Sequence, residues 1–275
     1  YESFAEFLQT DQDWVTYRSM MLDPYPEMRL VHARMLEWGA IQADAFEQEV
    51  RGFKAEDFAP LIERYDIDQI SLLYDAVVEK GNALLPPTKP KATNLCLFLP
   101  YGSCFVEPEE DSNTIYISLR IHPDQAELIL AHEYSHIIHI DRRPEEPISP
   151  KRELVSEGFA VYLTGSLIDG LTPSRSVPFM PAESFEWCIA NESLIRETIV
   201  KDLDIGFEAF MKRYIADGKG FAEPPPGFVE KTAYFIGYKI VEACVKKGYP
   251  IESICAMDAD TVIRTSGYFE VPERM

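Results

Sequence analysis

Residues 126–141 of the chain read AELILAHEYSHIIHID and contain two histidines and a glutamate in the pattern HExxH, at residues 132–136. Leucine, isoleucine and alanine surround the motif almost all round, which predicts a buried helix. Residues four apart lie one turn above each other on a helix, so the imidazoles of His132 and His136 can reach a single Zn²⁺ ion. Buried histidines and carboxylates need partners, and a divalent cation would satisfy them together. We therefore expect His132 and His136 to be metal ligands.

Glu133 lies on the same helix but is offset from the two histidines, which is the position of a base that acts on a metal-activated water. The alternative is an amphipathic helix whose histidines are ordinary hydrogen-bonded residues. His139 lies a further turn along and cannot easily complete a tetrahedron with the other two, so we expect it to be a neighbour of the ligands or a satisfied polar residue. The metzincin pattern needs Gly and His at positions that His139 and Arg142 occupy here, so it does not apply.

The third ligand is expected on the next helix, which Ser149 and Pro150 open as a capping residue and a first-turn proline. Glu157 shares its face of that helix with apolar residues, and a carboxylate on an apolar stripe is costly to bury unless it is paired or binds metal. We therefore predict Glu157 as the third ligand. The alternative is a salt bridge from Glu157 to one of three nearby arginines, Arg142, Arg143 or Arg152.

The composition is strongly acidic: 46 Asp and Glu against 26 Lys and Arg in 275 residues give a formal net charge of -20. Such a field repels phosphate backbones and anionic headgroups, so we expect neither nucleic acid nor membrane as a partner. No window reaches the roughly 18 consecutive apolar residues that span a bilayer. The five cysteines form no CxxC pair, which favours a reducing compartment and a cytoplasmic protein. Because the first residue is Tyr1 and not Met, this expectation leaves room for a removed signal segment.

The hydrophobic period divides the chain into two parts. Apolar residues recur every three or four positions over residues 26–45 and 68–81, which predicts helices. The run LLPPTKP at 84–90 interrupts this period, because proline removes a backbone donor and disfavours a helical predecessor. We therefore predict a helical N-terminal subdomain at residues 1–88 and a second domain at residues 89–275.

Beyond this boundary the period changes to two. Short strands are predicted at 95–99, 105–106 and 114–119, before the helix that carries HExxH. We expect these strands to form a small antiparallel sheet. The fold class is then α+β, mostly helical.

An HExxH motif followed about twenty residues later by a helical glutamate resembles the gluzincin division of zinc peptidases. More specifically, the chain resembles the bacterial family of predicted zinc-dependent proteases typified by YjaZ. That family has an HEYxH helix, then an EG-containing helix, then an aromatic-x-IGY-x-IV helix. The matching residues here are 132–136, 157–158 and YFIGYKIV at 234–241. The resemblance covers residues 90–275 and implies a zincin-like fold, one zinc ion per chain and peptidase activity.

The resemblance and the residue chemistry together predict hydrolysis of a peptide bond, with Glu133 as general base toward a zinc-activated water. A hydrogen-bond donor is then needed for the oxyanion. Tyr234 and Tyr238 lie four apart on one helix face, and Tyr238, beside Gly237, is the first choice. The alternative is that both tyrosines are core aromatics with satisfied hydroxyls.

The strand at 114–119 precedes the HExxH helix, as does the edge strand that pairs with extended substrates in zincins. We therefore expect a peptide to bind there by strand addition, the alternative being an ordinary edge strand.

The leading hypothesis is a mononuclear zinc metallopeptidase that acts on peptides or proteins. The alternative is a zinc-containing domain without proteolytic activity that binds a peptide or a partner protein in the same groove. Glu133 favours the enzyme, because a structural zinc site needs no base and usually has four protein ligands. A His-His-Glu set also binds other first-row divalent ions. The N-terminal helices could recognise substrate, cover the groove or form an oligomer, and the sequence does not choose among these roles.

Overall fold

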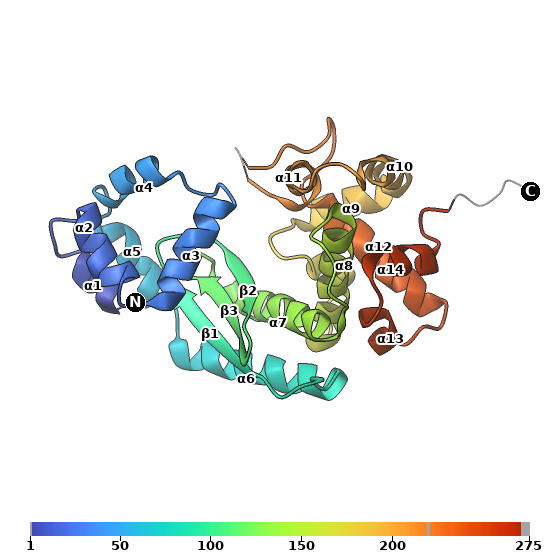
Figure 1. Ribbon diagram of the computed structural model, residues 1–275, viewed down its shortest axis with the longest axis horizontal. Helices are drawn as coiled ribbons and strands as arrows, with labels where there is room; N and C mark the ends of the chain where they lie inside the picture. Colours follow the sequence, from blue (N-terminus) through green and yellow to red (C-terminus); the bar gives the residue numbers. More distant parts are fainter. Residues whose placement is uncertain (1, 219–220, 271–275) are drawn as a thin grey trace, which may run out of the picture. The chain divides into compact units, whose positions relative to one another are not determined.

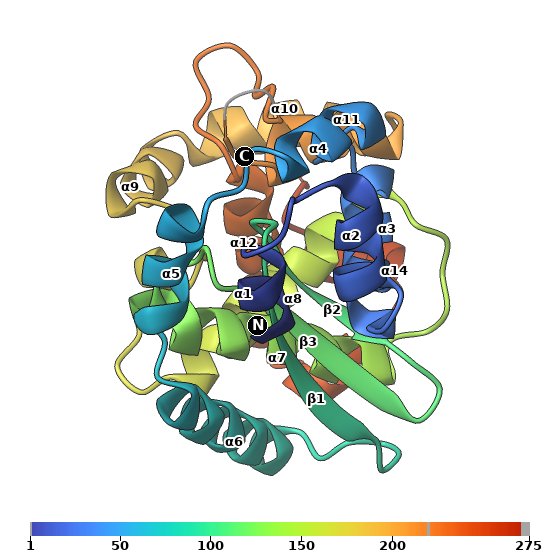
Figure 2. The same ribbon diagram turned by 90° about the vertical axis from the view of Figure 1, so that its left-hand side faces the viewer.

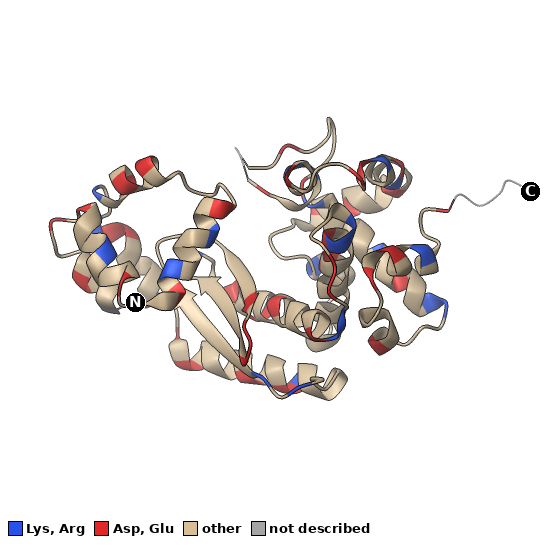
Figure 3. Ribbon diagram, in the orientation of Figure 1, with Lys and Arg blue, Asp and Glu red and all other residues tan. Residues whose placement is uncertain are grey.

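The structure, a computed structural model, describes residues 2–218 and 221–270. In these residues the chain is mostly helical with one small sheet (Figure 1), in agreement with the predicted α+β class. None of the described helices is long and apolar enough to cross a membrane. All five cysteines are free thiols. Acidic side chains are spread over many of the helices (Figure 3).

The helices and strands follow one another along the chain with short connections. Up to residue 125 they are α1 (Glu2–Phe7), α2 (Trp14–Tyr17), η1 (Arg18–Leu22), α3 (Pro26–Glu37), α4 (Ala43–Val50), α5 (Ala55–Glu63), α6 (Ile67–Leu84), β1 (Ala92–Phe98), β2 (Cys104–Pro108), β3 (Ser112–Ser118) and η2 (Pro123–Gln125). The remainder are α7 (Ala126–Arg142), α8 (Pro150–Leu167), η3 (Pro173–Arg175), α9 (Ala182–Ala190), α10 (Glu192–Asp202), α11 (Phe207–Phe210), η4 (Met211–Ile215), α12 (Thr232–Lys246), α13 (Ile251–Cys255) and α14 (Ala259–Ser266).

The chain forms two compact units, one of residues 1–74 with 92–126 and one of residues 75–91 with 127–275. The sheet belongs to the first unit together with the N-terminal helices, whereas α7 to α14 belong to the second. These units differ from the predicted single boundary after residue 88. The proline-rich run interrupts the helical period there, but the chain passes between the units at three other points.

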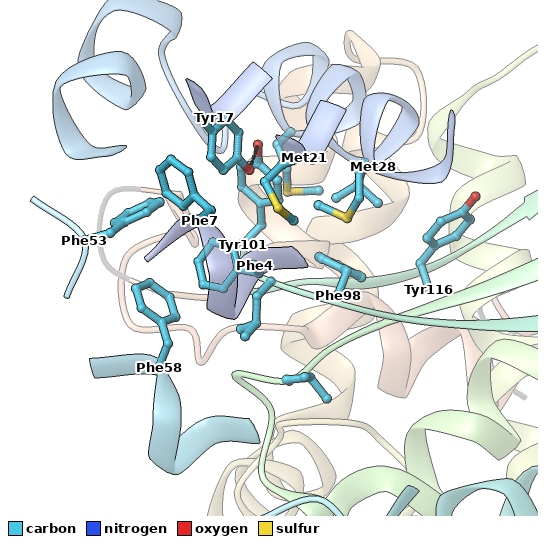
Figure 4. Packing of buried hydrophobic residues seen from close by; sticks show 14 of the residues in the cluster. Phe4, Phe7, Tyr17, Met21, Met28, Phe53, Phe58, Phe98, Tyr101 and Tyr116 are labelled. Carbon is cyan, nitrogen blue, oxygen red and sulfur yellow. Dashed lines mark hydrogen bonds between the residues drawn. The ribbon is translucent and has the colours of Figure 1, made fainter. Parts of the chain in front are cut away.

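Aromatic packing explains why the sheet belongs with the N-terminal helices. One hydrophobic core contains side chains from α1, from the helices that follow it and from the strands (Figure 4). Phe4 of α1 meets Phe58 of α5 edge to face, with ring centroids 4.9 Å apart. On the sheet, Phe105 and Tyr116 stack with centroids 4.7 Å apart. Burial of these large rings is the main favourable contribution to the first unit.

The sheet is mixed, and its strand order is β1-β3-β2 (Figure 2). A short connection at 109–111 makes β2 and β3 antiparallel, whereas β1 pairs with β3 in parallel because β2 serves as the crossover between them. The predicted antiparallel sheet is therefore wrong for β1. The prediction of an edge strand at 114–119 is also wrong, because Ile115 of β3 lies opposite Leu95 on one side and Val106 on the other. Strand addition to β3 is excluded.

The helix predictions hold with two changes. Helix α6 contains the predicted stretch at 68–81, but the helix predicted over 26–45 is two helices, α3 and α4. Gly39 lies between them with φ +70°, a conformation that ends a helix and that glycine adopts without strain. The α-helix with HExxH begins at Ala126, after a 3₁₀ turn that the His122 side chain caps by accepting from the Asp124 N–H at 3.3 Å.

Helices α8 and α12 pack against each other in the second unit (Figure 1). Both are buried at the point of contact, where Gly158 of α8 meets Gly237 of α12. A Cβ atom on either glycine would overlap the backbone of the other helix. The two glycines therefore set the distance between the helix axes.

We expect Gly158→Ala to lower the free energy of unfolding by about 1–3 kcal/mol or more, because the added methyl group forces α8 and α12 apart. Gly165→Ala on the same helix is the matched control, since its nearest foreign atom, Ser176 Oγ, would lie at an ordinary 3.5 Å. Alanine favours a helix over glycine, so the control should be neutral or stabilising. Urea unfolding followed by circular dichroism measures both, and equal effects would contradict the close packing.

Candidate metal centre

The structure brings the three predicted ligands together. His132 and His136 come from α7 and Glu157 comes from α8, and one ligand atom from each lies within 4.8 Å of the others. Glu157 Oε2 is 3.2 Å from His132 Nε2 and 3.7 Å from His136 Nε2. Both imidazoles thus present Nε2 to the same carboxylate oxygen. Such a His-His-Glu group can hold a divalent metal ion.

The donor atoms are shielded from water. His132 and Glu157 are buried, and His136 is nearly so. Although Glu157 Oε2 is close to both imidazoles, it makes no hydrogen bond of acceptable geometry. A buried carboxylate oxygen without a hydrogen bond is costly. A cation among the three side chains would remove that cost, so the donor set fits a metal ion.

The charges of the three groups are coupled. Burial alone would favour neutral His136, but the charge of Glu157 outweighs burial and raises the pKa of His136 above its ordinary value. Burial likewise acts to raise the pKa of Glu157, and the two histidines overcome it and hold that pKa well below its usual range. Glu157 is therefore an anion, the form that binds a metal ion.

The two histidines differ in what their other ring nitrogen contacts. Nδ1 of His136 lies 3.3 Å from Ser156 Oγ, on the residue that precedes Glu157 in α8. Metal-ligating histidines commonly bond through the second nitrogen in this way, which fixes the ring orientation. Nδ1 of His132 is buried without a hydrogen-bond partner among the described residues.

Glu133 follows His132 on α7 and is buried, with 5% of its surface exposed. Its charge acts on His136, so the carboxylate lies close to the ligand group. A second carboxylate that the sequence reasoning missed is Glu153, one turn before Glu157 on α8. Burial, and next the charge of Glu157, raise the pKa of Glu153 to about 7. The i, i+4 spacing of the two glutamates was the available signal.

The two candidate tyrosines of α12 lie in different surroundings. The ring of Tyr234 stacks near His132, with centroids 6.0 Å apart. Tyr238 instead donates its hydroxyl hydrogen to Glu242 Oε1 at 3.1 Å, and its ring stacks on Tyr162 at 6.1 Å. Burial, and next the charge of Glu242, raise the pKa of Tyr238 well above its ordinary value. Of the two tyrosines, Tyr234 is the one that the structure brings to the ligands.

His139 and the arginines lie outside the ligand group. His139 is buried with its ring 4.4 Å from that of Phe159, and burial, then the charge of Arg143, hold its pKa well below the ordinary value. It is thus a neutral imidazole beside the group, as expected. Arg142 pairs with Asp141 at 3.2 Å. Within the described residues, no salt bridge joins Glu157 to an arginine.

Comparison with family models, with curated proteins and with solved structures finds no match to this chain.

We expect His136→Gln and Glu157→Gln each to reduce bound zinc strongly, because each removes one of three ligands. His139→Gln is the matched control: it replaces a buried histidine on the same helix that is not in the group, so zinc should stay near the wild-type amount. Mass spectrometry of the purified proteins measures the metal content. Equal loss in all three variants would mean that the fold, and not the ligand set, had been disturbed.

Proposed function

We propose that this chain is a zinc-dependent metallopeptidase of the zincin type that hydrolyses peptides or proteins, with one zinc ion per chain. The observation that carries the proposal is the buried His132, His136 and Glu157 group with a buried glutamate, Glu133, directly beside its first member. Three protein ligands leave a coordination position for water or substrate, which is typical of catalytic zinc sites. The resemblance to the YjaZ-like family agrees with this function.

Each residue has a distinct task in the proposed reaction. His132, His136 and Glu157 hold the metal ion, and the Nδ1 contact of His136 with Ser156 orients one ring. When bound, zinc would polarise the substrate carbonyl and make a coordinated water more acidic. The Glu133 carboxylate takes a proton from the attacking water and delivers it to the nitrogen of the leaving amine. Burial of the site limits access of other water molecules.

The stabilising donor for the oxyanion is assigned to Tyr234 in place of the first choice, Tyr238. A donor must lie near the metal ligands, and the ring of Tyr234 lies beside His132. The hydroxyl of Tyr238 already donates to Glu242. Two tyrosines one turn apart on α12 therefore have separate roles, one at the site and one in packing against α8.

Glu133→Gln is expected to abolish peptide cleavage while bound zinc stays unchanged, because glutamine keeps the shape but cannot accept the proton. Glu127→Gln, on an exposed position of the same helix, is the control and should leave cleavage intact. Cleavage of a peptide library followed by mass spectrometry gives the readout. Zinc binding without cleavage in the wild-type protein would favour the alternative, a zinc-containing domain that binds a peptide or a protein.

Tyr234→Phe should lower kcat by about 10²–10³-fold with little change in KM, since the lost hydrogen bond forms only as the oxyanion develops. Tyr238→Phe should lower kcat by much less, because it removes a hydrogen bond to Glu242. Steady-state kinetics on one cleaved peptide, with zinc content measured in parallel, compares the two variants. A larger loss with Tyr238→Phe would restore that residue as the donor.

A further inference from the structure

Lys231, which precedes the first residue of α12, is a buried lysine with 6% of its surface exposed. Its ammonium group lies 2.9 Å from the Asp217 carboxylate and donates to the Pro178 carbonyl oxygen at 3.1 Å. Lysine is seldom buried to this degree unless it is paired. Asp217 remains about half exposed, so its charge is partly screened by water. The lysine therefore brings positive charge into the interior of the second unit.

The backbone at this position is unusual. Lys231 has φ +62° and Phe179 has φ +59°, both in the left-handed region that residues other than glycine seldom adopt. The ring of Phe179 lies 5.0 Å from the ammonium nitrogen of Lys231, so the two left-handed residues meet. Each such conformation costs on the order of 1–3 kcal/mol and persists only where the surroundings impose it. Such residues cluster at functional sites.

Lys231 is linked to the metal ligands through one aromatic ring. Its ammonium nitrogen lies over the ring of Tyr234, 5.2 Å from the centroid. That ring is the one that stacks near His132. A cation over an aromatic face is attracted by the ring and resists its rotation. The ammonium group thus holds Tyr234 in the orientation that keeps it beside the ligand.

We propose that Lys231 is a positioning residue for Tyr234, which it holds beside His132 so that the phenol hydroxyl is presented at the metal centre. The ammonium charge also strengthens the phenol as a hydrogen-bond donor to a developing oxyanion. This inference rests on the proposed function for its effect on turnover. The alternative is a purely structural role, in which Lys231 only ties residues 178–179 and Asp217 to the start of α12.

The position of the Tyr234 ring can be tested without measuring activity. Tyrosines labelled with ¹³C in the ring give one NMR signal that Tyr234→Phe removes and so assigns. In the metal-free and zinc-bound proteins, Lys231→Met should move this signal, because the ring leaves the neighbourhood of His132. Lys231→Arg should largely restore it, since guanidinium also binds aromatic faces. A Tyr234 signal that stays in place in Lys231→Met, while thermal stability falls, would overturn the proposal.

Kinetics test the same inference through a double-mutant cycle. Lys231→Met should lower kcat by about 5- to 30-fold with unchanged zinc content and little change in KM. In the Tyr234→Phe background the same substitution should cause no further loss, because its effect passes through the hydroxyl. Additive losses would overturn the positioning role.

A further variant and a further outcome keep the test decisive. Lys231→Asn, whose side chain tolerates the left-handed backbone, replaces Lys231→Met if that protein does not fold. A wild-type protein that binds zinc but cleaves nothing would refute the proposed function and not the contact itself. The NMR measurement then still decides whether Lys231 holds Tyr234 beside His132.

Discussion

The second unit is organised around a buried negative charge. Glu157 is on a helix whose neighbouring residues are almost all buried, and two imidazoles from α7 approach the same carboxylate oxygen. A carboxylate in such surroundings is stable only if positive charge lies against it. The histidines supply that charge when they are protonated, and a divalent cation would supply it more strongly. The position of α8 against α7 follows from this requirement.

Helix α12 completes the arrangement from a different direction. It packs on α8 through Gly158 and Gly237, one residue after the ligand Glu157 and three residues after Tyr234. The glycine contact therefore sits between a metal ligand and the tyrosine beside His132. Lys231 then fixes the start of α12 to two other segments of the unit. Ligand, tyrosine and lysine are thus placed by helix packing and not by flexible loops.

Local sequence was enough to predict the ligand group and most of the helices. The period of apolar residues identifies α7 as a helix, and the carboxylate on an apolar stripe singles out Glu157. The pairing of β1 with β3 was not predictable, because strand order depends on contacts distant in sequence, such as the aromatic packing that joins the sheet to α1. Spacing alone could not separate Tyr234 from Tyr238, since both lie on one helix face and only their neighbours differ. Lys231 was missed because its burial and its backbone conformation arise from tertiary contacts.

The glycine contact between α8 and α12 has a consequence for protein engineering. The HExxH helix and the helix with Glu157 look like a portable pair that could be grafted onto another helical scaffold. In this chain, however, the face of α8 beside the ligand is covered by backbone of α12 at a distance that only glycine permits. A graft of two helices would leave that face bare, and most scaffolds would cover it with side chains that hold the third helix too far away. The transferable module is therefore three helices with both glycines retained.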